Sequence, residues 1–490
     1  MQGDSVKRNI YFQFLYQVLV LIIPLVLAPY LTRTLGDTAL GIYSFTYSVG
    51  QIFVVVANLG IAKYGQRLIA EKKNNSEQLR KTFWSLFVVH AIVSLTVFAG
   101  FMLFSFLWGG QRRDNFLIQG FYVLSAFFDI TWLYYGIEKF KGVVIRNTVV
   151  KLLELVLIFS FVHSPSDLNK YTLIMSSSVM MGMAMLLPPS IRMIPPIRFS
   201  IQDCKAHIRP LCILFIASVA TLLFTFFDKT LLGMFSTVEN VAYYEYSNRI
   251  VMVPRTIATV ISTVMYSRAC VFIREAEFDK AKKYRDYSLT FAYIISFASI
   301  FGLLAVGDVF VNLYYGKDFA ECVGIINALS PTVLIVSVAD IIRTQLLIPL
   351  HKDREYTVVT IISAILNIAA SLLLLKPLGV YGVVVGSIAA EGFSLAATTY
   401  LCKKYINLGK GILEAIPYCM IGVVMFLVVQ PLRALSTNTV IALLAQVAIG
   451  AVIYGALSIL YMLFLSPSRE NYRQFVDSVL LKLRRGKRKT

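Results

Sequence analysis

Long apolar segments separated by short polar ones run through the whole chain. The first lies at residues 9–31, a nine-residue polar hinge follows at 32–40, and Gly41 opens a second apolar segment. About 20 apolar residues cross a hydrocarbon core ~30 Å thick, so each segment is long enough to span a membrane. Lipid offers the peptide backbone no hydrogen-bonding partner, and we therefore expect both segments to be helices.

Twelve further apolar windows bring the number of predicted membrane helices to fourteen. They lie at residues 83–108, 115–136, 146–163, 170–188, 209–232, 241–266, 287–307, 321–342, 356–375, 380–400, 412–430 and 439–465. Because membrane-length apolar windows cover most of the chain, the pattern predicts an all-α polytopic membrane protein.

The distribution of basic residues gives an independent test of this count. If the N-terminus is cytoplasmic, the loops on the inner side hold 34 Lys and Arg residues and the loops on the outer side hold 7. Basic residues concentrate in the cytoplasmic loops of membrane proteins, so the two sides should alternate in this way. The pattern therefore predicts a chain with both termini inside and an even number of spans.

Composition agrees with a membrane protein and limits its partners. Hydrophobic residues make up 57% of the 490 residues and charged residues only 15%, which is too little polar surface for a soluble chain of this length. The net charge of +19 is spread over short loops and a basic tail at 466–490. A tail of this kind is expected to contact anionic membrane lipids on the cytoplasmic side rather than nucleic acid.

The sequence contains no arrangement of side chains that is typical of an enzyme. The six cysteines and four histidines are scattered, without the spacing of metal ligands or a catalytic pair. The predicted outer loops are short, whereas a membrane glycosyl-polymerase or ligase would need a large one. We therefore predict a transporter with no cofactor, no bound metal and no catalytic residues, and keep the polymerase or ligase as the alternative from another class.

A short motif occurs twice and predicts two related halves. Residues 33–36 read Arg-Thr-Leu-Gly at the end of span 1, and residues 229–233 read Lys-Thr-Leu-Leu-Gly at the end of span 7. A repeat six spans apart is typical of transporters built from two lobes with the substrate site between them. The predicted parts are an N-terminal lobe at 1–200, a C-terminal lobe at 201–405, two further helices at 406–465 and the tail at 466–490.

Several short motifs together resemble the bacterial polysaccharide flippases (Wzx type) of the MOP exporter superfamily. The resemblance covers nearly the whole chain, although Arg343 stands where that family usually has a small residue. The residues that carry it are Pro29-Tyr30-Leu31-Thr32-Arg33-Thr34-Leu35-Gly36, Leu40-Gly41-Ile42-Tyr43, Asn58-Leu59-Gly60-Ile61-Ala62-Lys63-Tyr64-Gly65, Asp228-Lys229, Leu232-Gly233, Tyr314-Tyr315-Gly316-Lys317-Asp318-Phe319, Gln345-Leu346-Leu347-Ile348-Pro349-Leu350, Asn367, Leu378-Gly379-Val380-Tyr381-Gly382 and Glu391.

The resemblance implies two pseudo-symmetric six-helix lobes and a function in the bacterial cytoplasmic membrane. Members of this family carry undecaprenyl-pyrophosphate-linked oligosaccharide repeat units from the inner to the outer leaflet for capsule, O-antigen or exopolysaccharide assembly. The implied mechanism is alternating access with a cationic central cavity, and the implied partners are a polysaccharide polymerase and glycosyltransferases. The alternatives within the superfamily are a lipid II flippase and an exporter of drugs or metabolites.

Charges inside the predicted spans indicate where a lipid-linked anion could bind. Glu245 and Arg249 are spaced i,i+4 on one face of span 8, and one interpretation is that they neutralise each other. Arg255 has no acidic neighbour at helical spacing, and a guanidinium suits a pyrophosphate or an acidic sugar in a water-filled cavity. We predict Arg249 and Arg255 as substrate-binding residues.

The ends of spans 1 and 7 carry a second group of charges. Asp228 and Lys229 end span 7, and Arg33 occupies the corresponding place in span 1. These side chains either meet the substrate head group at the outward exit or anchor the helices by reaching water. We predict Arg33 and Lys229 as substrate-binding residues, and Asp228 and Glu245 as candidates for ion coupling.

Two more acidic residues lie deep within predicted spans. Asp129 in span 4 and Glu391 in span 12 could each bind a coupling proton or cation, or form a hydrogen bond between helices. Small residues surround Glu391, which favours close helix packing. Lys151 and Glu154 are spaced i,i+3 and are expected to pair.

Overall fold

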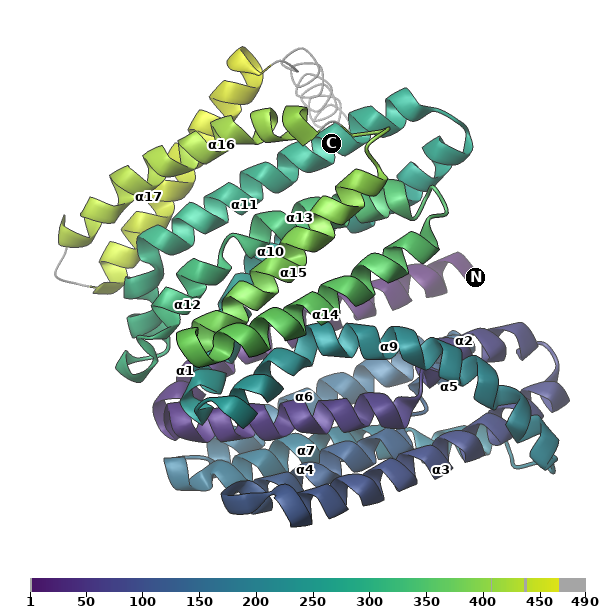
Figure 1. The fold of residues 1–490 in the computed structure, drawn as a ribbon. Coiled ribbons are helices and arrows are strands. Elements are labelled where there is room, and N and C mark those ends of the chain that lie inside the picture. Colours follow the sequence, from purple (N-terminus) through teal and green to yellow (C-terminus); the bar gives the residue numbers. More distant parts are fainter. Residues whose placement is uncertain (1, 407, 436–438, 467–490) are drawn as a thin grey trace. The chain divides into compact units, whose positions relative to one another are not determined.

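The computed structural model describes residues 2–406, 408–435 and 439–466, and the regular elements within these ranges are all helices (Figure 1). The predicted tail lies outside the described residues from 467 onward. The predicted all-α class is confirmed for the part of the chain that the structure describes.

Residue contacts divide the chain into two compact units. Unit 1 comprises Met1–Glu245 and Thr360–Gly386, and unit 2 comprises Tyr246–Val359 and Ser387–Thr490. The lobes predicted at 1–200 and 201–405 stay a prediction. The helices that contribute residues to both units are α10 (Val238–Arg274), α14 (Asp353–Leu378) and α15 (Val380–Leu401).

Unit 1 is a helical bundle in which α1 packs against α3, α4, α6 and α9. Its apolar core includes Phe83 and Trp132, which are fully buried with ring centroids 5.4 Å apart. Lys151 and Glu154 form the predicted ion pair at 2.9 Å. The helices wholly in unit 1 are α1 (Gln2–Asn58), α2 (Ile61–Lys72), α3 (Ser76–Trp108), α4 (Arg113–Leu124), α5 (Thr131–Gly136), α6 (Phe140–Phe161), α7 (Leu168–Ala184), α8 (Leu187–Met193) and α9 (Ile201–Phe235).

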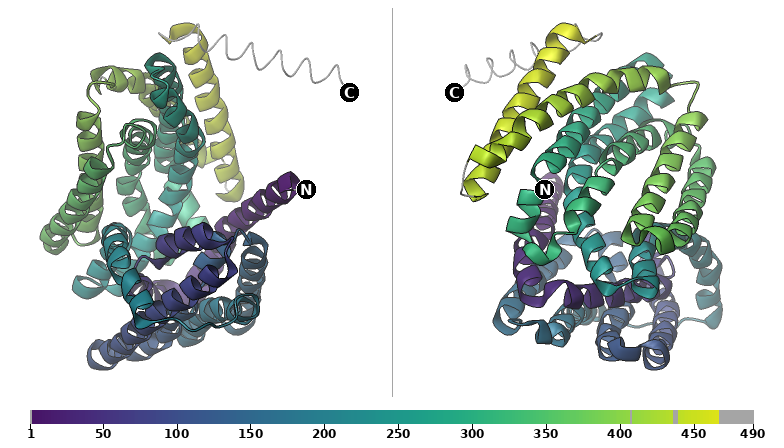
Figure 2. Two further views of the ribbon diagram at one scale, coloured as in Figure 1. Left: turned by 90° about the vertical axis from the view of Figure 1, so that its right-hand side faces the viewer. Right: turned by 60° about the vertical axis from the view of Figure 1, so that its left-hand side comes forward.

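Unit 2 is built around its longest whole helix, α11, against which α13, α16 and α17 pack (Figures 1 and 2). Tyr293 of α11, Tyr418 of α16 and Tyr454 of α17 are buried in one apolar cluster. A π-helical turn, η5 (Arg343–Leu347), follows α13 directly. The helices wholly in unit 2 are α11 (Phe278–Tyr314), α12 (Cys322–Leu329), α13 (Thr332–Ile342), α16 (Leu408–Val429) and α17 (Thr439–Leu460).

Eleven candidate spans in the described part of the chain are long and apolar enough to cross a membrane. Large apolar side chains on these helices point outward: Leu373 is 76% exposed and Val452 is 70% exposed, as expected of surfaces that face lipid. Predicted spans 1 and 2 are counted as one of the eleven, because residues Ile22–Lys72 form one continuous candidate span. The 22-residue α6 and the 35-residue α9 are not among the eleven.

The predicted hinge at 32–40 is shorter in the structure than the sequence suggested. Helix α1 continues through it with a single kink at Gly36, whose φ of 76° and ψ of 179° are not helical. The kink needs a glycine, because side chains rarely tolerate a positive φ in this region. A second break separates α1 from α2, where Leu59 and Gly60 both have positive φ.

The two copies of the repeated motif lie side by side in unit 1. We call residues 36–48 and 230–243 the paired hinges. Thr38 Oγ1 donates to Glu239 Oε1 at 2.9 Å, Ser48 Oγ and Thr230 Oγ1 are 3.1 Å apart, and the Tyr243 hydroxyl donates to Asp37. The repeat predicted from the sequence is thus also a site of contact between distant parts of the chain.

Glycines make this close approach possible. A Cβ atom on Gly41 would lie 1.9 Å from the Val238 carbonyl oxygen, and one on Gly233 would lie 1.9 Å from the Phe45 ring. The Val238 carbonyl oxygen belongs to the backbone, which cannot rotate away from an added Cβ atom as a side chain can. The paired hinges therefore require glycine at position 41.

We expect Gly41→Ala to lower the free energy of unfolding by about 2 kcal/mol, because overfilling a packed contact costs ~1–3 kcal/mol. Thermal denaturation of the purified protein in detergent measures the change. The matched control is Gly100→Ala in α3, where an added Cβ meets no atom within 4 Å. An equal effect of the two substitutions would contradict the close contact at Gly41.

Candidate functional site

The first group of buried charges lies in unit 1, where α9, α10 and α14 meet. We call Asp228, Lys229, Tyr244, Glu245 and Asn367 the Asp228 cluster. Asp228 Oδ2 accepts a hydrogen bond from the Tyr244 hydroxyl at 2.7 Å, and Asp228 Oδ1 accepts one from Asn367 Nδ2 at 2.9 Å. Lys229 Nζ forms an ion pair with Glu245 Oε2 at 2.8 Å. The formal charge of the cluster is therefore −1.

The structure corrects one interpretation of Asp228 and Lys229. Water-reaching anchors would be exposed, but the two residues are only 5% and 9% exposed, and their side chains are bonded to protein groups. Both residues lie on α9 and bond to α10, two helices joined by a short turn at Ser236. Burial of these charges is possible because each has a partner of opposite charge or a hydrogen-bond donor.

The second group lies in unit 2 and connects α10, α13, η5 and α15. We call Arg255, Thr332, Asp340, Arg343 and Glu391 the Arg255 cluster. Arg255 Nη2 donates to Thr332 Oγ1 at 2.6 Å, and Arg343 Nη2 lies 3.9 Å from Asp340 Oδ1. The charges of Arg255, Arg343 and Asp340 all act on the buried carboxylate of Glu391. Two acids and two arginines give this cluster no net charge.

Both arginines of the Arg255 cluster have hydrogen-bonding capacity that the protein does not use. The Nε atoms of Arg255 and Arg343 are buried and have no hydrogen-bond partner. An unsatisfied N–H of a charged group in a buried place is costly. The free N–H groups leave each guanidinium able to donate to an additional acceptor, such as water or a phosphate oxygen.

The remaining predicted residues are Arg249, Arg33 and Asp129. Arg249 is stacked over the Tyr246 ring, with its Cζ 4.9 Å from the ring centroid, and Arg33 is exposed with Nη1 3.5 Å from the Pro29 carbonyl oxygen. The sequence suggested that Asp129 lies within the helix of span 4, but in the structure Asp129 lies outside the regular helices. It breaks span 4 between η2 (Ser125–Phe128) and α5, and its Oδ1 accepts from Thr131 N and Oγ1 at 3.0 and 2.6 Å.

The sequence identified several of the clustered residues but not their partners. Lys229 was not expected to pair with Glu245, and the Glu245–Arg249 pair stays a prediction. Asn367 was noted only as part of a motif, although an amide within an apolar helix is itself a signal of a polar contact. Thr332 was missed, since its role depends on a helix 77 residues away in the sequence.

The described residues include no group of three or more His, Cys, Asp or Glu side chains that could hold a metal ion. The Asp228 cluster in unit 1 contains carboxylates that accept hydrogen bonds, and the Arg255 cluster in unit 2 contains guanidinium groups that donate them. Such groups can bind a proton or a cation in the first case and an anionic oxygen in the second.

Comparison with known proteins identifies the family. The sequence profile described as "Polysaccharide biosynthesis protein" matches residues 6–266, more than half of the chain. The chain belongs to this polysaccharide biosynthesis protein family. Two curated relatives are both described as putative O-antigen transporters. The one from Shigella dysenteriae is 21% identical over 79% of this chain and 97% of its own, and the one from Escherichia coli strain K12 is 22% identical over 76% and 90%.

A solved structure supports the fold of this family member. The lipid II flippase MurJ, in an inward closed conformation, aligns with a TM-score of 0.73 over 92% of this chain and 98% of its own. The sequence identity is 16%, so the similarity concerns the fold alone. The chain is therefore a multi-pass membrane protein, and the part that the structure describes is all-helical.

Proposed function

We propose that this protein is a flippase that moves undecaprenyl-pyrophosphate-linked oligosaccharide repeat units from the inner to the outer leaflet of the bacterial cytoplasmic membrane. Its product would enter capsule, O-antigen or exopolysaccharide assembly. One observation carries the proposal: a chain with eleven candidate membrane spans in its described part belongs to a polysaccharide biosynthesis family. The description of two relatives as O-antigen transporters supports it.

The proposed topology has fourteen spans with both termini in the cytoplasm. Two six-helix lobes would be followed by two C-terminal helices, as the positions of the basic residues and the repeated motif suggest. Transport by alternating access then needs an outward end that opens and closes. The paired hinges lie at the ends of spans 1 and 7, which this topology puts on the outer side.

Within this mechanism, Arg249, Arg255, Arg33 and Lys229 are proposed to meet the pyrophosphate and sugar during its passage. Free N–H capacity on Arg255 supports its part in this. Asp228, Glu245, Asp129 and Glu391 are proposed as the acids that respond to a proton or cation gradient. If the variant Asp129→Asn/Glu391→Asn still flips fully in liposomes without any gradient, Asp129 and Glu391 have no role in ion coupling.

Complementation tests the function directly. We expect deletion of the gene to abolish surface polysaccharide while cell-wall growth stays normal, and the intact gene to restore it. Reconstituted protein should expose a fluorescent polyprenyl-pyrophosphate oligosaccharide on the far leaflet of liposomes. The second candidate, suggested by the fold of the lipid II flippase, predicts lysis on depletion and flipping of lipid II instead. These outcomes separate the two substrates.

We expect a disulfide across the paired hinges to stop transport. Ser48 Oγ and Thr230 Oγ1 are 3.1 Å apart, so Ser48→Cys/Thr230→Cys should form one readily after the six native cysteines are replaced by alanine. Flipping in liposomes should fall to background on oxidation and return with a reducing agent, because the hinges must separate for the outward end to open.

The single variants under the same oxidant are the control. Ser48→Cys or Thr230→Cys alone cannot form the bridge and should leave flipping unchanged. Undiminished transport with the Ser48–Thr230 bridge fully formed would mean that the paired hinges do not open.

A further inference from the structure

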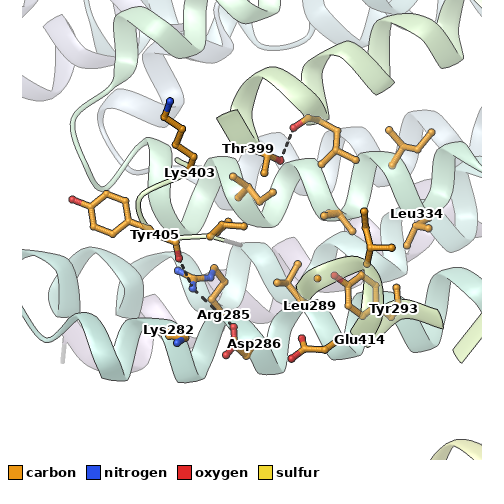
Figure 3. A pocket seen from close by; sticks show the side chains of 18 of the residues that line it. Lys282, Arg285, Asp286, Leu289, Tyr293, Leu334, Thr399, Lys403, Tyr405 and Glu414 are labelled. Carbon is orange, nitrogen blue, oxygen red and sulfur yellow. Dashed lines mark hydrogen bonds and ion pairs between the residues drawn. The ribbon is translucent and has the colours of Figure 1, made fainter. Parts of the chain in front are cut away.

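Unit 2 contains a cavity whose lining includes no residue of either charge cluster. Its volume is about 420 Å³, within the range of roughly 300–1,000 Å³ typical of ligand sites. Helices α11, α13, α15 and α16 line it, together with residues 403–406 that follow α15 (Figure 3). The proposed function assigns no role to this cavity.

One end of the cavity is apolar. Leu289 and Tyr293 of α11 lie opposite Leu334 of α13 in this part (Figure 3). Most of the other lining side chains are aliphatic, and they include Ile335, Val338, Ile342, Leu395 and Ile412. The Glu414 carboxylate lies beside Leu289 and Tyr293 (Figure 3). An apolar cavity of this size buries a hydrocarbon chain favourably, since about 25 cal/mol is gained for each Å² removed from water.

The other end is basic. Lys282, Lys403 and Lys404 are exposed at the cavity's edge, whereas Arg285 is only 5% exposed (Figure 3). Arg285 Nη2 donates to the Tyr405 carbonyl oxygen at 3.0 Å, and its Nε is buried without a partner. Asp286 Oδ1 lies 3.9 Å from Arg285, which is too far for a hydrogen bond. The Arg285 guanidinium can therefore donate a hydrogen bond to a further anionic group.

We propose that this cavity binds an anionic phospholipid of the cytoplasmic leaflet, with one acyl chain among the aliphatic side chains and the phosphate at Arg285 and the three lysines. Four basic side chains outnumber the two acids of the lining, Asp286 and Glu414. The inference uses the proposed topology, in which the basic end faces the cytoplasm, where anionic lipids attract Lys and Arg. The bound lipid would hold α15 against α11 and α16.

Photo-crosslinking tests the site in the intact protein. The probe is phosphatidylglycerol with a diazirine in one acyl chain, added to protein in phosphatidylcholine nanodiscs, and labelled peptides are mapped by mass spectrometry. We expect labelling at Leu289, Tyr293 and Val338, competed by unlabelled phosphatidylglycerol. Lys403→Gln/Lys404→Gln should lower the labelling about tenfold, because each basic residue contributes to attraction of the anionic lipid.

Two controls keep the result interpretable. Lys72→Gln/Lys73→Gln removes the same charge from a half-buried and an exposed lysine in unit 1 and should leave the labelling unchanged. Val338→Phe should reduce it by filling the cavity, in protein that still elutes as a single species on size exclusion.

Equal labelling by a phosphatidylcholine probe, or no response to Lys403→Gln/Lys404→Gln, would overturn the proposal. Stronger displacement by undecaprenyl phosphate than by phosphatidylglycerol would also overturn it and assign the cavity to the lipid chain of the substrate. Labelling does not require transport, so failure here is distinguishable from failure of the proposed function.

Discussion

Replacing Asp228 by alanine is expected to abolish transport and to lower the free energy of unfolding by about 3 kcal/mol. The substitution removes the acceptor of two buried hydrogen bonds, from Tyr244 and Asn367, and losing a buried acceptor costs ~1–3 kcal/mol for each donor. Surface polysaccharide in a complemented deletion strain measures the first effect, and thermal denaturation in detergent measures the second.

The isosteric variant separates charge from hydrogen bonding. Asp228→Asn keeps the shape of the side chain and one carbonyl acceptor, while the Tyr244 hydroxyl can turn and accept from the new amide. We expect this variant to be folded, with stability within about 1 kcal/mol of the original protein, but to flip at least tenfold more slowly. Transport at the original rate would show that Asp228 serves only as an acceptor and has no part in ion coupling.

Replacing Glu391 by glutamine is expected to destabilise unit 2 by about 2 kcal/mol. The carboxylate is buried and lies within the influence of Arg255 and Arg343, and its loss leaves the Arg255 cluster with a net charge of +1. Arg343 and Asp340 are partly exposed, so solvent screens the imbalance and the cost is smaller than for a fully buried pair. The measurement is thermal or chemical denaturation of the purified protein.

A second substitution should restore part of this loss. Arg343→Met removes one positive charge, so the double variant Glu391→Gln/Arg343→Met has no net charge in the cluster. We expect it to be about 1 kcal/mol more stable than the sum of the single effects predicts, which is the sign of coupling in a double-mutant cycle. The matched comparison is Glu391→Gln/Asp340→Asn, which adds to the imbalance and should show no such recovery. Additive effects in both cycles would mean that Glu391 does not interact with Arg343.

Features that depend on neighbours along the chain could be predicted from the sequence. Apolar length gave the helices, because lipid leaves the backbone only that solution, and i,i+3 spacing gave the Lys151–Glu154 pair. The hinge at Gly36 was predicted from a polar interruption, although its sharpness was not. A single residue with positive φ is enough to turn the chain, and this is not visible in hydrophobicity.

Partners from distant helices could not be predicted in the same way. Asp228 meets Asn367 across 139 residues of sequence, and Arg255 acts on Glu391 from another helix. Helical spacing relates only residues of one helix, so it suggested Arg249 as a partner of Glu245 but could not reveal that Lys229 of another helix pairs with Glu245. Asp129 shows the same limit. Its apolar surroundings predicted a continuous helix, but the helix is interrupted at Asp129, whose carboxylate accepts a hydrogen bond from Thr131 N at the start of α5.

The contact between the two hinges also has a consequence during synthesis. Thr38 meets Glu239, 201 residues later in the chain. At a translation rate of about 5–20 residues per second, the first hinge waits roughly 10–40 s in the membrane before its counterpart emerges from the ribosome. Through that interval the narrow face around Gly41 is open to other helices and to quality-control proteases. A nascent chain arrested before residue 239 should therefore be degraded faster than one arrested after residue 245.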